Sequence, residues 1–186
     1  MGAFFPVFPL TMFTTNFHSK AKIGLSLTAL VAAWCFWLWQ PERQVRLHQR
    51  HLLDAAQDRK WQKLNALLDD GFRTPNGHDK TLALQQLGEV LQPFFALQIV
   101  DSETKTALDG RTGSVRTVLR INGTGLPLAE AVKTGVNQSH EPFEFIWKRN
   151  SWKPWDWRLV HTAHPLIGLA GGRDALALIL RGSPHF

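Results

Sequence analysis

The sequence predicts an α+β domain in which three N-terminal helices pack on a curved antiparallel sheet, preceded by one transmembrane helix. Three observations lead to this fold class. Between Pro41 and Pro93, apolar residues recur three and four positions apart, the spacing of helices with one buried face. After Pro93 they alternate with polar residues, as in strands of a half-buried sheet. Ahead of both regions runs an uncharged stretch that resembles a membrane span.

The uncharged stretch begins at Ile23 and ends at Trp39. A helix needs about 20 mostly apolar residues to cross a bilayer, so this stretch is at the short end. Its tryptophans gather at the C-terminal end, where indole rings favour the membrane interface. We therefore expect a flexible segment over 1–22 and a single-pass transmembrane anchor over 23–40. The alternatives are a cleaved signal, for which no small-residue cleavage pattern is present, and a buried core helix.

Basic residues stand on both sides of the stretch, so the charge difference across it does not decide the orientation. Long domains cross membranes largely regardless of charge. We therefore expect the C-terminal domain to be exported, as into a bacterial periplasm. The expected partners are the membrane and either another protein or a second copy of the chain.

The remaining residues, 41–186, are about the size of one compact domain. The whole chain has 21 Lys and Arg against 15 Asp and Glu, and the charges are interspersed rather than grouped. A nucleic-acid partner is therefore not expected. The single cysteine, Cys35, lies in the predicted anchor, which excludes disulfides and cysteine-bound metals within the domain. No cofactor is predicted.

Two helices are expected at the start of the domain. The first begins at Pro41, because proline suits the first turn of a helix. Asp58 is expected to cap a short second helix, and Gly71 to end it. The residues that share the apolar face of this second helix are Trp61, Leu64 and Leu68.

The third helix is bounded by two residues with clear physical roles. Asp79 can accept a hydrogen bond from the first turn, and Pro93 ends the helix because a proline inside it would remove a hydrogen bond. The apolar stripe of this helix is formed by Ala83, Leu87, Val90 and Leu91.

The second half of the domain is expected to be a sheet. Asp109 and Gly110 predict a tight hairpin turn between two strands. The loop over 123–141 is long enough for a short helix from Pro127 or for a functional lid. The last two strands place aromatic and apolar residues on one face, namely Phe143, Phe145, Trp147, Trp155, Trp157 and Leu159.

Residues 41–164 resemble the nuclear transport factor 2-like superfamily, also called SnoaL-like, which includes ketosteroid isomerases, polyketide cyclases and many non-enzymatic domains. The resemblance rests on the order of three helices and a sheet, on the W-x-x-L-x-x-L-L run over 61–68, and on the closing strand WDWRLVHTAH over 155–164. It implies a cystatin-like cone with a pocket at its open end. Enzymes of the superfamily use a carboxylate base and hydroxyl or protonated-acid donors there. This chain has no tyrosine, so a tyrosine donor is excluded.

The candidate site residues are few. Asp79 is a weak candidate for a catalytic base, and its alternative role is the helix cap. His161 and His164 lie three apart on a strand and so point to opposite faces, which does not favour a metal pair. No metal site is predicted. The weak ligand-binding candidates are Trp61, His78, Phe95, Trp147, Trp157 and His161.

The expected function is that of a membrane-anchored, non-catalytic binding or assembly domain. The alternatives are a carrier or sensor of a small hydrophobic ligand and, behind it, a lyase, isomerase or hydrolase that uses the cone pocket. An open cavity would favour the alternatives, and a filled one would favour protein interaction. The apolar tail over 165–186, which is expected to be partly helical, is predicted to pack against the domain.

Overall fold

A computed structural model describes residues 28–31, 34 and 39–164 of the chain. The chain divides into two units, Met1–Trp39 and Gln40–Phe186, and the fold below is that of the second. Within the described residues, no helix is both long enough and apolar enough to cross a bilayer. Most of the predicted anchor, the segment 1–22 and the tail 165–186 lie outside the described residues.

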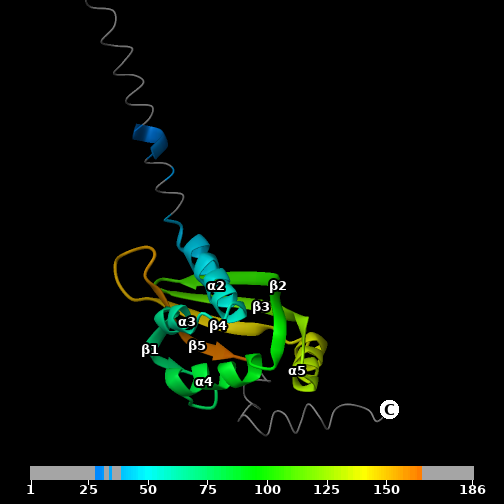
Figure 1. The fold of residues 1–186 in the computed structure, drawn as a ribbon. Helices are drawn as coiled ribbons and strands as arrows, with labels where there is room; N and C mark the ends of the chain where they lie inside the picture. The colour runs from blue at the N-terminus through cyan, green and yellow to red at the C-terminus, as the bar shows by residue number, and fades with distance from the viewer. Residues whose placement is uncertain (1–27, 32–33, 35–38, 165–186) are drawn as a thin grey trace, which may run out of the picture. The chain divides into compact units, whose positions relative to one another are not determined.

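The second unit is an α+β domain with helices packed on a curved mixed sheet (Figure 1). The elements in chain order are α2 (Pro41–Gln57), α3 (Trp61–Leu67), β1 (Leu68–Arg73), α4 (Lys80–Leu91), β2 (Phe94–Asp109), β3 (Thr112–Gly125), α5 (Pro127–Gln138), β4 (Phe143–Arg149) and β5 (Trp157–Ala163).

The sheet has the order β1-β5-β4-β3-β2. Four of its strands pair antiparallel, as predicted, but β1 pairs parallel with β5, so the expectation of a wholly antiparallel sheet was wrong. The register places Leu68 beside Leu159 and Arg73 beside His161. Strand β1 comes between α3 and α4 in the chain and forms the edge of the sheet next to β5, the last strand. Because β1 runs parallel to β5, the sheet is mixed.

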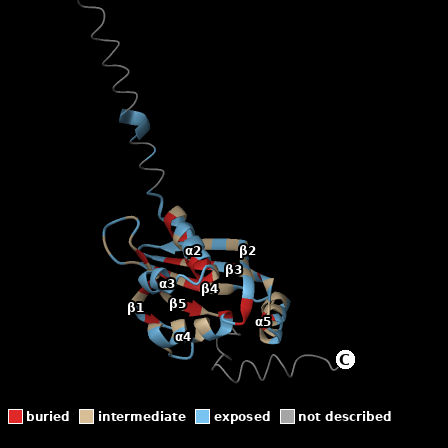
Figure 2. Cartoon of the chain, viewed as in Figure 1, coloured by how far each residue is buried: buried red, intermediate tan, exposed pale blue. Residues whose placement is uncertain are grey.

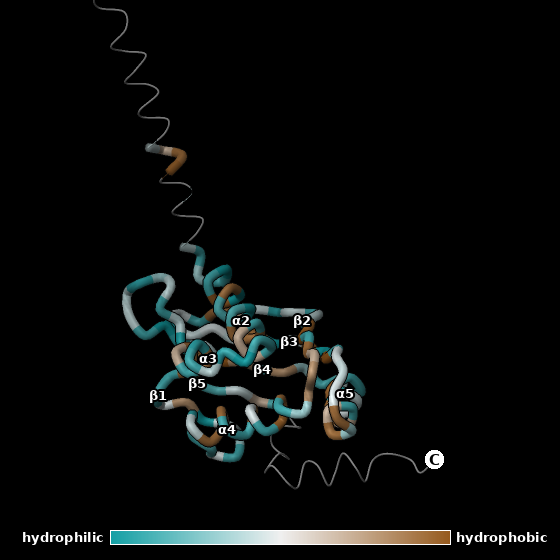
Figure 3. The backbone as a smooth tube through the Cα atoms, in the orientation of Figure 1, coloured by the Kyte–Doolittle hydropathy of each residue, from teal (hydrophilic) through white to brown (hydrophobic). Residues whose placement is uncertain are grey.

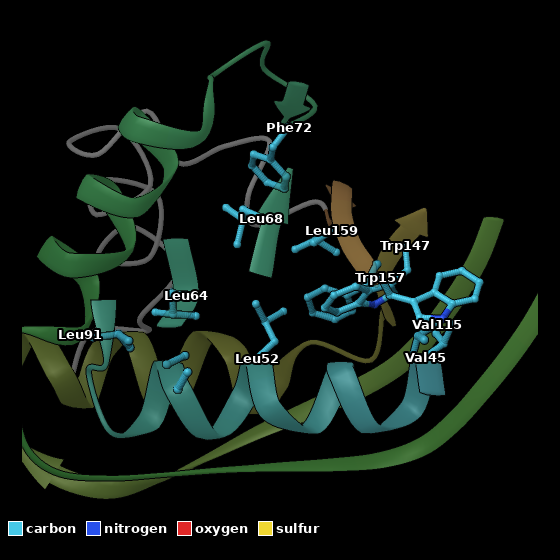
Figure 4. Packing of buried hydrophobic residues seen from close by; sticks show 13 residues of the cluster. Val45, Leu52, Leu64, Leu68, Phe72, Leu91, Val115, Trp147, Trp157 and Leu159 are labelled. Atoms are coloured by element: carbon cyan, nitrogen blue, oxygen red, sulfur yellow. The ribbon is translucent and has the colours of Figure 1, made fainter. Parts of the chain in front are cut away.

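The long hairpin of β2 and β3 bends around the helices, and it forms the curved side of the sheet (Figure 4). Its register shifts between Ser102 and Lys105, where Glu103 has a φ of 53°. An extra residue of this kind bends a strand and increases its twist. At this distortion the hydroxyl of Thr117 on β3 donates a hydrogen bond to the backbone carbonyl of Ser102 at 3.0 Å.

The core lies between α2 and the sheet (Figures 2 and 4). Hydrophobic and hydrophilic residues interleave along α2, α4 and α5, as in helices with one buried face (Figure 3). Trp147 and Trp157 are almost completely buried in this core. The residues that α2 buries are Gln44, Val45, Gln49, Leu52, Leu53, Ala55 and Ala56.

The short second helix differs from its prediction at both ends. Asp58 is the C-cap of α2 and does not cap α3, because Arg59 turns the chain with a φ of 55° and α3 then follows Lys60. The helix ends at Leu67 rather than near Gly71. Leu68 is already in extended conformation and starts β1.

Other predicted boundaries are confirmed. The first helix begins at Pro41, and the third follows the Asp79 cap and ends before Pro93. Gly110 has a φ of 55° in the turn between β2 and β3. A helix, α5, begins at Pro127 in the predicted loop region. The prediction that Trp155 lies on the last strand was wrong. The loop closes only at Asp156, whose carbonyl accepts from the N–H of Asn150, so the strand begins at Trp157 and Trp155 stays in the loop with 55% of its surface exposed.

Candidate ligand-binding cavity

A cavity of about 450 Å³ lies between the sheet and the helices α2, α4 and α5. Almost all of the side chains that line it are apolar. The polar members of the lining are Thr74, Gln86, Glu89 and Thr162. Glu89 and Val90 are exposed, so the cavity reaches the surface beside α4.

Helix α4 forms one wall of the cavity, and most of its residues are not fully buried. Only Leu91 is buried among its twelve residues. Ala83, Leu84 and Leu87 are half-buried, and all three line the cavity. The apolar face of α4 therefore packs only partly against the core and leaves part of its surface to the cavity. An apolar cavity gives water few hydrogen-bond partners and favours an apolar guest.

Helix α5 forms a second wall, with Val132 and Val136 facing the cavity. Asn137 fastens this helix to β3: the backbone N–H of Ile121 donates to Asn137 Oδ1 at 2.7 Å, and Asn137 Nδ2 donates to the carbonyl of Ile121 at 2.8 Å. Strand β4 pairs with β3 only as far as Thr117, so the amide of Asn137 satisfies backbone groups that β4 does not reach.

The edge of the cavity next to β4 contains a buried histidine. The ring of His164 stacks on Phe143, which lines the cavity, and its Nε2 lies 3.2 Å from Ser139 Oγ and 3.1 Å from the carbonyl of Glu141. Burial lowers the pKa of His164, and the Glu141 carbonyl and carboxylate partly oppose that shift. Its surroundings beside the cavity therefore favour the uncharged form of His164.

Asp79 caps α4 and does not line the cavity. Its Oδ1 accepts a hydrogen bond from the backbone N–H of Leu82 at 2.9 Å, and the residue is exposed. The preceding residue, His78, places its Nδ1 3.1 Å from Gln86 Oε1. His78 therefore does not line the cavity itself but contacts Gln86, which does.

Two of the predicted ligand-binding residues are part of the core. Trp147 donates its indole N–H to Gln49 Oε1 at 3.1 Å, and Trp157 donates to the carbonyl of Pro154 at 2.8 Å. Neither indole lines the cavity behind the sheet. Trp147 and Trp157 therefore pack the core, whereas Phe143 and Phe145, which were predicted on the same face, do line the cavity.

The other three predicted residues also lie outside the cavity lining. Trp61 is 38% exposed and lies against α4 at Gly88. Phe95 is 75% exposed at the start of β2. His161 places its Nδ1 2.8 Å from the carbonyl of Arg73 and joins β5 to the edge strand. The structure does not bring these three residues together.

The residues that do line the cavity carry little reactive chemistry. Glu89 is the one carboxylate among them; it is exposed and accepts a hydrogen bond from Gln85 at 3.1 Å. Within the described part of the chain, no three His, Cys, Asp or Glu side chains are grouped to hold a metal ion. A buried acid or base aimed at a bound molecule, which general acid–base catalysis needs, is absent from the described lining.

A second, wider depression of about 870 Å³ lies on the surface between α2, α3 and the loop before β5. Charges of both signs line it, and some already form ion pairs, such as Asp58 with Lys60 and Asp156 with Arg158. His48 also lines it, and burial lowers the pKa of this histidine. A depression with balanced charges gives no clear preference for an ionic ligand.

The sequence contained part of the signal for the cavity. The predicted stripe of α4 supplies four lining residues, Ala83, Leu87, Val90 and Leu91. The contribution of α5 was missed, although Leu128, Val132 and Val136 recur every four residues after Pro127, the spacing of one helix face.

No protein-family model matches the chain. No curated protein matches it either. Solved structures do. A conserved protein from Planctomyces limnophilus is 19% identical, with a TM-score of 0.51 over 66% of this chain and 93% of that one. At this identity the likeness shows the fold alone.

Two further solved structures have TM-scores below 0.5. A nuclear transport factor 2-like protein from Cytophaga hutchinsonii is 20% identical, with a TM-score of 0.45 over 65% of this chain and 94% of that one. Bd1075 from Bdellovibrio bacteriovorus is 10% identical, with a TM-score of 0.49 over 65% of this chain. This chain spans 38% of the length of Bd1075.

Proposed function

We propose that this chain is a non-catalytic binding protein that holds a small apolar molecule in the cavity between α4, α5 and the sheet. The observation that carries the proposal is the cavity itself. Its volume of about 450 Å³ falls within the range of roughly 300–1,000 Å³ that is usual for small-molecule sites. The half-buried apolar face of α4 supports the proposal, because a bound molecule would cover it.

The chemistry of the lining supports binding rather than catalysis. Thr74, Gln86 and Thr162 can orient a ligand through one or two hydrogen bonds, but they supply no base of suitable strength. A ligand that buries about 250 Å² of apolar surface would gain roughly 6 kcal/mol at 25 cal/mol/Å². Before the costs of association, that corresponds to a Kd in the tens of micromolar.

This proposal changes the order of the functions that the sequence suggested. A binding or assembly role came first there, because the sequence indicated an anchor and a fold but no reactive group of residues, and an open cavity was the observation that would favour the ligand alternative. Trp147 and Trp157 fill only part of the space behind the sheet, and the cavity beside α4 supports the hydrophobic-ligand alternative.

We also propose that the stretch from Ile23 to Trp39 attaches the protein to a membrane, with the domain on the exported side. Its support is the absence of charge over the stretch and the tryptophans at its end. A binding domain placed at a membrane could exchange an apolar ligand with the lipid phase.

The proposal is tested by titrating the full-length protein with the neutral fluorophore N-phenyl-1-naphthylamine. We expect saturable binding that Ala83→Phe and Val136→Phe weaken at least tenfold, because each added ring occupies the cavity. The matched control is Ala107→Phe, on the exposed surface of β2, which should bind as the wild type does. Equal affinity in all four proteins would contradict the proposal.

A second variant separates a vacant cavity from one that the tail fills. Leu178→Asp places a charge in the apolar tail. If the wild type does not bind the fluorophore and Leu178→Asp does, the tail is the occupant and the ligand proposal fails. If both bind alike, the tail does not compete for the site.

A further inference from the structure

The loop over 150–156, between β4 and β5, exposes two tryptophans. Trp152 is 81% exposed and Trp155 is 55% exposed, whereas Trp147 and Trp157 on the flanking strands are almost fully buried. Tryptophan is highly buried on average, so two large exposed indoles in one short loop indicate an interaction surface.

A set of hydrogen bonds fixes the backbone of this loop. The N–H of Asn150 donates to the carbonyl of Asp156 at 2.8 Å and closes the loop at its base. Trp157 donates its indole N–H to the carbonyl of Pro154 at 2.8 Å. Arg111, from the turn between β2 and β3, donates to the carbonyls of Arg149 and Asn150 at 3.2 Å. These bonds give the loop a defined backbone conformation in which Trp152 and Trp155 are exposed.

The loop lies at the end of the domain where the chain enters it. The first turns of α2 pack beside the β2–β3 turn, because Val45 approaches Gly113 and Arg46 donates to Thr106 Oγ1 at 3.2 Å. Figure 1 shows the loop and the start of α2 at one end of the sheet. We call the start of α2 (41–46), the turn (109–112) and the segment 148–158 together the hairpin end.

The hairpin end is basic. It carries seven Lys and Arg against three Asp and Glu. Two of the three carboxylates form ion pairs within this end, Glu42 with Arg46 at 2.7 Å and Asp156 with Arg158 at 3.7 Å. The basic residues are Arg43, Arg46, Arg111, Lys148, Arg149, Lys153 and Arg158.

We infer that the hairpin end docks on an anionic phospholipid surface, with Trp152 and Trp155 in the membrane interface and the exposed basic side chains, Arg46, Arg111, Lys148 and Lys153, on the headgroups. Indole rings favour the interface, and Lys and Arg are attracted to anionic lipid. Docking at this end fits the entry of the chain at Pro41, two residues after the uncharged stretch. The inference rests on the proposed membrane attachment and is independent of the ligand cavity.

The test places a fluorescent label at two positions of the full-length chain. Cys35→Ser removes the single cysteine, and Trp152→Cys or Phe95→Cys introduces one for an environment-sensitive nitrobenzoxadiazole label. Phe95 is the matched control because it is an aromatic residue with 75% exposure at the other end of β2. The labelled proteins are reconstituted into phosphatidylcholine vesicles with and without phosphatidylglycerol.

We expect the label at 152 to brighten at least twofold in phosphatidylglycerol vesicles and to be quenched by spin-labelled lipid. The label at 95 should stay accessible to iodide. Lys153→Glu combined with Lys148→Glu, both at exposed positions, should remove most of the brightening in anionic vesicles and have little effect in neutral ones.

Three results would overturn the inference, and they differ in what else they affect. If the protein floats with the vesicles while the label at 152 stays in water, docking fails but membrane attachment stands. If the protein does not float at all, both fail. If the label at 152 is shielded without lipid and in proportion to protein concentration, a second copy of the chain covers the hairpin end instead.

Discussion

The imidazole of His164 stacks on the ring of Phe143, with ring centroids 3.7 Å apart and planes 6° from parallel. Phe143 is part of the cavity wall, so this pair links the end of β5 to the proposed ligand site. The stack also buries a titratable group, and this gives the domain a predictable response to acid.

Burial lowers the pKa of His164 below the ordinary value of a histidine. As the pH falls below about 6.5, the unfolded chain takes up a proton that the folded domain resists, so the free energy of unfolding decreases with falling pH. His48 acts in the same direction, because burial lowers its pKa too. We expect a lower urea midpoint at about pH 5.5 than at about pH 7.5.

The assignment to His164 is checked by substitution. His164→Gln keeps a hydrogen-bonding group but cannot titrate, so the difference in urea midpoint between the two pH values should shrink. His140→Gln, at an exposed position in the α5–β4 connection that His164 contacts through Ser139 and Glu141, is the control and should keep the full difference. An undiminished difference in His164→Gln would show that other groups cause the acid response.

The hydrogen bond from Trp147 to Gln49 predicts a coupled pair in the core. Gln49→Met leaves the buried indole N–H without its acceptor and should cost about 1–3 kcal/mol. Trp147→Phe should cost more, since it also removes apolar volume. The double variant Gln49→Met/Trp147→Phe should cost less than the sum of the two, measured by urea unfolding. Gln62→Met, on the exposed face of α3, is the control. Additive costs would mean that the bond contributes little.

The capping role of Asp79 makes a prediction that separates it from a catalytic role. Asp79→Ala removes the acceptor for the Leu82 N–H and should lower the free energy of unfolding by about 1 kcal/mol. Asp79→Asn keeps a good cap and should be nearly neutral. Both variants should bind N-phenyl-1-naphthylamine with wild-type affinity at a temperature where they are folded. A loss of ligand binding in the well-folded Asn variant would be inconsistent with a purely capping role.

Two glycines predict opposite effects of the same substitution. A Cβ at Gly123 would lie 2.1 Å from the carbonyl oxygen of Ala96, and the residue has a φ of 150°. Gly123→Ala should therefore destabilise the domain by more than about 2 kcal/mol. A Cβ at Gly88, within α4, would meet only Trp61 at 3.9 Å. Gly88→Ala should stabilise the domain by about 0.5–1 kcal/mol through helix propensity. Thermal unfolding of both variants checks the pair, and equal effects would contradict it.

The sequence predicted the elements that local chemistry bounds. Pro41, the Asp79 cap, Pro93 and the turn at Gly110 each restrict the backbone where they stand, and their positions agree with the structure. Strand β1 was missed because no local sequence signal marks it as a strand. Its six residues, LDDGFR, include two aspartates and a glycine, which are uncommon in strands, and its pairing with β5 comes from the tertiary fold.

The cavity was harder to predict than the helices around it. The stripe of α4 identifies apolar residues that need cover, but a sequence pattern is the same whether packed side chains or open space lie opposite. That depends on how α4, α5 and the curved sheet meet, and so on Asn137 holding α5 against Ile121. The predicted tryptophans and histidines were too few and too scattered in the fold to mark this place.

The most direct test of the central claim is methyl NMR of the full-length protein during titration with N-phenyl-1-naphthylamine. We expect chemical-shift changes at Leu87, Ile121 and Val132, which line the cavity from three elements. Val100 and Leu108, exposed on β2, should not change. Shift changes confined to Val100 and Leu108, or none at the three cavity residues at saturating fluorophore, would contradict it.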